Sequence, residues 1–241
     1  MADARAIIEG LREEIRRLER KAPGRAAFVA SGRQDVDALL PGGGFPRGAL
    51  SELSGGPASG KTALALGALA RAMGEEGLGA WVDGRGELYP PAAAALGVDL
   101  DRLLLVRPRA PAGAAGAAER ARCGLWAAEA VLASGAFGTV VVDVALEDLR
   151  GVSASGLTGM LRRLRAAAEQ GGTVGLWLSA PRAARIPAAV RLDVEAGAGG
   201  PAIRRAFGRG SVCAPAPQFF SAPAPQLPLP QLAAPEVGHA A

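Results

Sequence analysis

Several residue types that often carry chemistry are scarce in this sequence of 241 residues. Its one histidine is His239, and its two cysteines, Cys123 and Cys213, stand far apart with no C-x-x-C pair. The single histidine argues against histidine-based catalytic triads and histidine-rich metal sites. The isolated cysteines predict neither a disulfide nor a zinc site, so we expect reduced thiols and a cytoplasmic protein.

Long apolar runs and lysine are also scarce. The longest uncharged apolar run, residues 130–142, contains two glycines and is too short to cross a bilayer. Only Lys21 and Lys61 are lysines, so arginine carries most of the positive charge behind the net charge of +4. Residues 182–209 hold six arginines and two acids, which makes this stretch the best candidate for contact with an anionic partner.

The most informative pattern that is present is a phosphate loop, G-x-x-x-x-G-K-[ST]. It consists of Gly55, Gly56, Pro57, Ala58, Ser59, Gly60, Lys61 and Thr62. A strand-like run, ALSELS, precedes the loop and a helix-like run, TALALGALARAM, follows it, which is the context that the motif requires. Backbone N–H groups of such a loop bind phosphate oxygens, while Lys61 would reach the β- and γ-phosphates and Thr62 would ligate Mg²⁺. The motif predicts binding of a nucleoside triphosphate.

Strands and helices alternate through the middle of the chain, which predicts an α/β fold with a mainly parallel sheet flanked by helices. We expect strands at residues 49–54, 79–83, 103–106, 138–143 and 173–179, and helices near 62–73, 89–96, 116–133 and 154–170. Residues 188–195 and 202–207 are also strand-like. Arg162, Arg163 and Arg165 fall away from the apolar stripe of the last helix, so we interpret them as a solvated face.

The two ends of the chain differ from this central part, residues 25–212. Residues 1–24 predict an amphipathic helix and a linker, and the helix either packs on its own domain or docks on another protein. Residues 213–241 contain seven prolines and no lysine or arginine, which predicts a disordered tail. Within this tail, Gln226, Leu227 and Leu229 belong to a segment that looks like a degenerate sliding-clamp-binding peptide, although a plain tail is the simpler interpretation.

A second candidate site residue is Asp143, at the end of the β-branched run TVVVDV. Ligands of open α/β sheets bind at the carboxyl ends of the strands, so Asp143 is placed to hold Mg²⁺ through water beside the phosphate loop. The alternative is an acid that caps the following turn.

Longer segments resemble the RecA recombinase family. The resemblance runs through VASGRQDVDALLPGGGFPRGALSELSGGPASGKT and AWVDGRGELYPPAAAALGVDLDRLLL, and continues in ASGAFGTVVVDV and VRLDV. The G-G-x-P-x-G lead-in at residues 43–48 and the L-G-V-D segment at residues 96–99 are more specific than the phosphate loop alone. The resemblance implies a RecA-like core that binds ATP and magnesium.

One departure from the family pattern concerns hydrolysis. The recombinases place a catalytic glutamate two residues beyond an aspartate, and counting from Asp83 that position is Arg85. A guanidinium group cannot accept a proton from the attacking water. Glu87 is a weak substitute, and Glu52 and Glu147 are further candidates, so we expect weak or absent ATPase activity.

A second departure concerns DNA. The two DNA-binding loops of the family are reduced here to residues 145–155 and 180–187, and the sensor glutamine position falls on Ala180. Arg182 and Arg185 remain in the second loop, but so little contact surface predicts weak or indirect DNA binding. Arg204, Arg205 and Arg209 stand where the family has basic residues that act across the filament interface, although a solvated basic edge is the simpler interpretation.

An N-terminal helix, an intact phosphate loop, reduced DNA loops and a Pro-rich tail together resemble the ImuA family of RecA/SulA-like accessory proteins in bacterial translesion mutagenesis. The resemblance implies contacts with RecA and with an ImuB-type polymerase-family protein in the SOS response, with nucleotide as a structural ligand or switch. Two other functions stay open, a DNA-dependent ATPase of the recombinase kind and a SulA-like inhibitor of cell division. A clock- or signalling-type kinase is disfavoured because no second RecA-like repeat is present.

Overall fold

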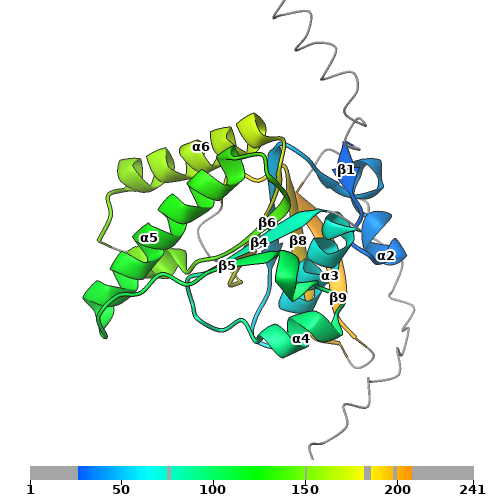
Figure 1. Cartoon of the computed structure of the whole chain (residues 1–241), viewed down its shortest axis with the longest axis horizontal. Coiled ribbons are helices and arrows are strands. Elements are labelled where there is room, and N and C mark those ends of the chain that lie inside the picture. Colours follow the sequence, from blue (N-terminus) through cyan, green and yellow to red (C-terminus); the bar gives the residue numbers. More distant parts are fainter. Residues whose placement is uncertain (1–26, 75–76, 150, 182–185, 198–199, 208–241) are drawn as a thin grey trace, which may run out of the picture.

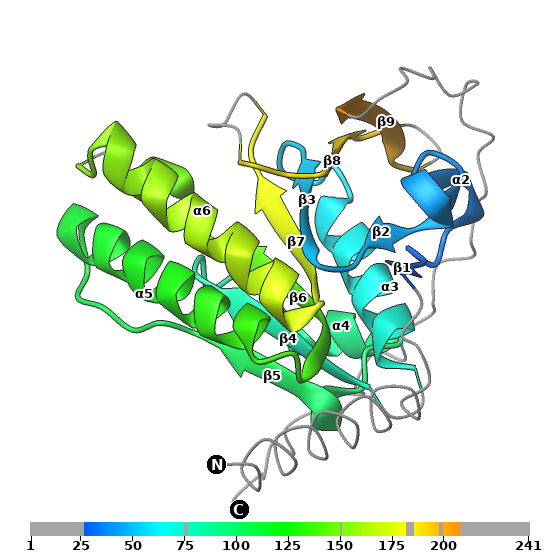
Figure 2. The same cartoon turned by 90° about the horizontal axis from the view of Figure 1, so that it is seen from above.

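The chain folds into a central sheet with helices on both faces, as Figures 1 and 2 show in two views. The computed structural model describes residues 27–74, 77–149, 151–181, 186–197 and 200–207. The predicted α/β fold with a mainly parallel sheet is confirmed. The helix predicted at residues 1–24 and the tail predicted at residues 213–241 lie outside the described residues.

Seven strands form the main sheet in the order β5-β4-β6-β7-β3-β8-β9. Their bounds are β3 (Ala49–Ser54), β4 (Leu78–Asp83), β5 (Leu103–Val106), β6 (Phe137–Asp143), β7 (Val174–Ser179), β8 (Val190–Glu195) and β9 (Ala202–Phe207). All neighbouring strands are parallel except β8 and β9, which are antiparallel. The strand that leads into the phosphate loop, β3, therefore lies between β7 and β8.

Alternate residues of each central strand pack into two separate hydrophobic cores. Trp81 and Val141 belong to the core under α3 (Lys61–Met73), while Val82 and Val142 belong to the core under α5 (Ala114–Ala133) and α6 (Ala154–Gly171). Helices α5 and α6 lie side by side on the same face of the sheet (Figure 2). Because both faces are covered, the central strands are almost continuously apolar, which is why they stand out in the sequence.

The helix ends follow from local residue chemistry. Ser153 precedes α6, and its hydroxyl accepts a hydrogen bond from the Gly156 N–H at 3.2 Å, which satisfies a backbone donor of the first turn. The helix ends at Gly171, and the following Gly172 has a φ of 59°, in the left-handed region that glycine adopts readily. The short helix α4 (Pro90–Ala95) begins with two prolines, which is favourable in a first turn. Predicted and observed ends of the main elements differ by no more than two residues.

Four small elements before the phosphate loop have no counterpart in the sequence-based prediction. Strands β1 (Phe28–Val29) and β2 (Phe45–Pro46) pair antiparallel, with α2 (Gln34–Asp37) and the short helix η1 (Pro41–Gly43) between them. Gly42 has a φ of 70°, and a Cβ atom there would lie 2.4 Å from the Phe28 ring. A glycine is therefore required where this segment folds back on itself.

Two further short helices, η2 (Leu100–Arg102) and η3 (Leu146–Leu149), precede β5 and follow β6, respectively. Within the described ranges, no helix combines the length and the hydropathy that a membrane span requires.

Candidate nucleotide-binding site

The predicted phosphate loop connects β3 to α3 and bends around the N-terminus of that helix. The Gly55 N–H donates to the Ser179 carbonyl oxygen at 3.0 Å, which ties the start of the loop to β7. A Cβ atom on Gly55 would lie 2.4 Å from the Ser59 Oγ and 2.5 Å from the Val194 carbonyl oxygen, so only glycine fits there. The loop ends at Gly60, which has a φ of 93° and immediately precedes α3. The first six predicted residues thus form a continuous turn, and Lys61 and Thr62 are the first two residues of the helix that follows.

Lys61 folds back over this turn. Its Nζ atom donates to the carbonyl oxygens of Gly55 at 2.9 Å and Gly56 at 3.1 Å. Burial lowers the pKa of Lys61, and the nearby Asp143 carboxylate opposes that effect. Thr62, the next residue, has an exposed side chain in the first turn of α3. The ammonium group is therefore already positioned at the loop, where phosphate oxygens could replace the two carbonyl oxygens.

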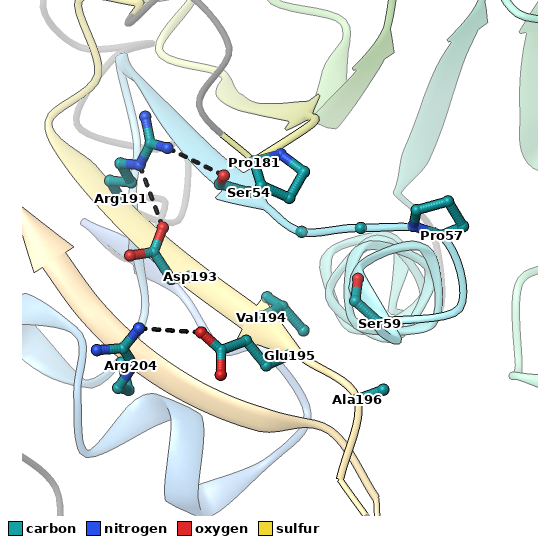
Figure 3. A pocket seen from close by; sticks show the side chains of 12 residues that line it. Ser54, Pro57, Ser59, Pro181, Arg191, Asp193, Val194, Glu195, Ala196 and Arg204 are labelled. Atoms are coloured by element: carbon teal, nitrogen blue, oxygen red, sulfur yellow. Dashed lines mark hydrogen bonds and ion pairs between the residues drawn. The ribbon is translucent and has the colours of Figure 1, made fainter.

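The loop separates two cavities. One has a volume of about 340 Å³ and extends from Lys61 and Thr62 to Ala92 and Leu96 near α4. The other, of about 720 Å³, lies on the β8 and β9 side of the loop (Figure 3). Ser59 lines both, and its buried Oγ atom has no hydrogen-bond partner among the described residues. A buried hydroxyl without a partner is costly, and a phosphate oxygen would satisfy it.

Asp143 lies at the carboxyl end of β6, as predicted, in register with Asp83 of β4. Its Oδ1 atom accepts a hydrogen bond from the Nε of Arg85 at 3.1 Å, and the Nη2 of Arg85 donates to the Oε1 of Glu147 at 3.1 Å. Burial raises the pKa of Asp143 to about 6; Arg85 opposes the shift, and Asp83 adds to it. The residue at the catalytic glutamate position therefore forms an ion pair with the predicted magnesium carboxylate.

Asp83 organises the turn that carries Arg85 and Glu87. Its carboxylate accepts hydrogen bonds from the backbone N–H groups of Glu87 at 3.0 Å and Leu88 at 3.2 Å, and from the Nε of Arg107 at 2.8 Å. The Glu87 side chain is exposed and makes no hydrogen bond or ion pair with another described residue. Glu87 thus lies on the rim of the site without a contact that would position a water molecule.

Glu52, another candidate for the catalytic base, already pairs with two other side chains. It is 1% exposed, accepts a hydrogen bond from the Ser179 hydroxyl at 2.7 Å, and forms an ion pair with Arg191 at 3.1 Å. Arg191 also donates to the Ser54 hydroxyl at 3.0 Å and to Asp193 at 3.3 Å, as the dashed lines in Figure 3 show. The network joins β3, β7 and β8 beside the phosphate loop. The role of Arg191 could not be predicted from the sequence, because its partner Glu52 is 139 positions away.

The segments that correspond to the family's DNA loops are described only in part. The first contains η3 and leads into α6, while in the second the Ala180 carbonyl oxygen accepts a hydrogen bond from the Ser54 hydroxyl at 3.4 Å. Arg204 lines the larger cavity and pairs with Glu195 at 3.0 Å, and both side chains are about two-thirds exposed. Arg205 lies opposite Leu192 in the pairing of β8 and β9. Arg182, Arg185 and Arg209 lie outside the described residues.

The donor set for a metal is limited. In the described part of the chain, no group of three or more histidine, cysteine, aspartate or glutamate residues could hold a metal ion. Magnesium at a phosphate loop needs only a hydroxyl and one carboxylate besides the phosphates, so Thr62 and Asp143 remain its predicted ligands. The ion pair between Asp143 and Arg85 weighs against that role for Asp143.

A phosphate loop between a central parallel strand and a helix, with an aspartate ending another strand at the same sheet edge, defines the P-loop class of α/β proteins. The RecA N-terminal domain family matches residues 10–173, and the chain belongs to the RecA family. Protein RecA of Lactococcus lactis subsp. cremoris (strain MG1363) is 37% identical over 145 residues, which cover 59% of this chain and 35% of that protein.

Two further similar proteins are also RecA proteins. Protein RecA of Streptococcus pyogenes serotype M49 is 38% identical over 129 residues, covering 54% of this chain and 32% of the relative. Protein RecA of Streptococcus parasanguinis is 39% identical over 129 residues, covering 54% of this chain and 31% of the relative. The similarity thus spans about a third of the length of these curated relatives.

Proposed function

We propose that this chain is a RecA-like accessory protein of SOS-induced translesion DNA repair, which binds ATP and acts through protein partners rather than as a recombinase. One observation carries the proposal: an intact phosphate loop stands beside a carboxylate that is ion-paired with Arg85, the residue at the catalytic glutamate position. This arrangement supports nucleotide binding at the loop and argues against rapid hydrolysis.

Three features support nucleotide binding at the loop. The Lys61 ammonium group is held against the loop carbonyls, and the buried Ser59 hydroxyl has no partner among the described residues. The loop precedes the N-terminus of a 13-residue helix, whose unpaired N–H groups and dipole favour anions. We expect ATP to bind with its phosphates at residues 55–62.

Weak or absent hydrolysis follows from the carboxylates that the site offers. Asp143 and Glu147 share the cation of Arg85, Glu52 is used by Arg191, and Glu87 has no described partner that would orient it. A hydrolytic base must hold a water molecule in line with the γ-phosphate, and small displacements cost large factors in rate. We therefore expect turnover far below that of an active recombinase.

In this proposal the partners are RecA and an ImuB-type polymerase-family protein, reached from the cytoplasm in DNA-damaged cells. Family membership and the predicted N-terminal helix support an interaction role, and the short loop segments support weak or indirect DNA contact. A weak sliding-clamp contact through Gln226, Leu227 and Leu229 belongs to the same proposal, and those residues lie outside the described ranges.

Affinity purification from DNA-damaged cells tests the partner assignment. The full-length chain is compared with a variant lacking residues 1–21 and with a variant lacking residues 213–241. We expect RecA and a polymerase-family protein to copurify with the full-length chain, and each deletion to reduce the recovery of the partner that binds the deleted end. If neither protein is recovered with the full-length chain, the accessory role is wrong.

Two biochemical measurements separate this proposal from its alternatives. A DNA-dependent ATPase would turn over faster with single-stranded DNA, whereas we expect a slow rate that DNA does not change. A SulA-like division inhibitor would not need the phosphate loop, whereas we expect ATP affinity that is lost on Lys61→Ala. Stimulated turnover would favour the first alternative, and undetectable ATP affinity would favour the second.

A further inference from the structure

The turn that carries Arg85 is fixed at both ends. On one side, the Gly84 N–H donates to the Asp143 carbonyl oxygen at 2.9 Å, next to the last register pair of β4 and β6. On the other side, the Asp83 carboxylate holds the backbone N–H groups of Glu87 and Leu88. The backbone at Arg85 is thus positioned by the sheet itself, and its side chain projects from a constrained turn.

From this turn the Arg85 side chain reaches two carboxylates in different elements. Asp143 ends β6 and Glu147 lies in η3, and the guanidinium contacts both at 3.1 Å. The Arg85 side chain is 27% exposed and that of Asp143 is 9% exposed, so this pair is screened by water less than a surface pair. A magnesium ion that used Asp143 would have to displace a cation that is tethered to the same site.

The guanidinium lies at the sheet edge that carries the phosphate loop, because β6, which ends at Asp143, and β3, which leads into the loop, both pair in parallel with β7. A cation at this edge attracts the phosphate oxygens of a ligand that binds at the loop. In most phosphate-loop sites a divalent metal supplies the second positive charge that neutralises the triphosphate.

We propose that the Arg85 guanidinium replaces magnesium in this site, so that the chain binds a nucleoside triphosphate without a divalent metal ion. The inference rests on the proposed nucleotide binding and adds to it the form of the ligand, the metal-free triphosphate. Arg85 acts here as a positioning residue for phosphate charge, with Asp143 and Glu147 holding it in place.

The test is an equilibrium titration of the full-length chain with methylanthraniloyl-ATP, followed by fluorescence, once in magnesium chloride and once in EDTA. Wild type is compared with Arg85→Ala, with Arg85→Gln, and with Arg162→Ala, which removes an exposed arginine from α6 as a charge-matched control. Circular dichroism and the melting temperature establish that each variant is folded, and Arg85→Gln serves if Arg85→Ala does not fold.

For wild type and for Arg162→Ala, we expect the dissociation constant in EDTA to agree within about threefold with the one in magnesium. For Arg85→Ala, we expect binding to be at least about tenfold weaker in EDTA than in magnesium. A wild-type affinity that falls by about tenfold or more in EDTA overturns the inference while leaving nucleotide binding intact. Metal-independent binding by both Arg85 variants also overturns it. Absence of binding in both buffers overturns the proposed nucleotide binding and this inference together.

Discussion

Breaking the buried ion pair between Glu52 and Arg191 from one side should strongly destabilise the sheet around the phosphate loop, because one buried charge is left without its partner. The two side chains are only 2% and 12% exposed, and the carboxylate also accepts the Ser179 hydroxyl. Glu52→Gln keeps the shape but leaves the Arg191 charge without its main partner. Removing one member of a buried pair typically costs about 3–5 kcal/mol. Asp193 still contacts Arg191, so we expect the lower end, about 3 kcal/mol.

The assay is urea denaturation followed by tryptophan fluorescence, because Trp81 and Trp177 are fully buried and report on both cores. A loss of about 3 kcal/mol in a domain of this size also lowers the melting temperature by about 6–12 °C. The matched control is Arg204→Gln on the neighbouring strand, whose pair with Glu195 is two-thirds exposed and should contribute less than about 1 kcal/mol.

A double-mutant cycle separates the pair from the rest of the network. Glu52→Gln combined with Arg191→Gln removes both charges, so the double variant should be more stable than the sum of the single effects predicts, by at least about 2 kcal/mol. Single effects that add to within about 0.5 kcal/mol would show that the two charges do not interact, and a Glu52→Gln cost as small as that of Arg204→Gln would refute the reasoning.

Four further predictions concern the site. The fold raises the pKa of Asp143 from 3.8 to about 6, which favours the protonated acid; the corresponding stability is present below about pH 4 and lost as the pH rises through 6. Between pH 4 and 7.5, the free energy of unfolding of wild type, measured by urea titration, should therefore fall by about 3 kcal/mol relative to that of Asp143→Asn. A difference between the two proteins that does not change with pH would contradict this. Gly55→Ala should weaken ATP binding at least about tenfold, because the new Cβ would collide with Ser59 and Val194, whereas Gly56→Ala has open space around it and should not weaken binding. Equal affinities of the two variants in fluorescence titrations would show that the loop can relax. ATP at about 100 times its dissociation constant should stabilise wild type by about 2.7 kcal/mol in thermal shift assays and leave Lys61→Ala unchanged, and an equal shift in both would place ATP elsewhere. Arg85→Glu should raise ATP turnover above wild type and Arg85→Gln should not, as measured by phosphate release; equal rates would mean that Arg85 is not what limits hydrolysis.

The phosphate loop and Asp143 could be predicted because each is defined by neighbours in the sequence. The eight loop residues need only the strand before them and the helix after them, and the run ending at Asp143 is apolar because its strand is buried on both faces. The same local patterns predicted the helix and strand ends to within two residues. Both features can therefore be recognised from a short stretch of adjacent residues.

The contacts that decide the chemistry could not be predicted in this way. The partners of Arg85 are 58 and 62 positions away, and Glu52 and Arg191 are 139 positions apart. Such pairs depend on the lateral order of the strands, which a sequence of alternating strands and helices does not determine. Strands β1 and β2 have only two residues each, too few for an alternation to show.

The place of β3 in the sheet also determines when the phosphate loop can form during synthesis. Its neighbours β7 and β8 begin at Val174 and Val190, more than a hundred residues after the loop leaves the ribosome. Until then the loop lacks the Ser179 carbonyl oxygen that anchors Gly55 and the arginine that neutralises Glu52. Contacts between such distant segments form late in folding because they close long loops. The nascent chain thus carries the complete motif long before the loop reaches the folded geometry on which the proposed nucleotide binding depends.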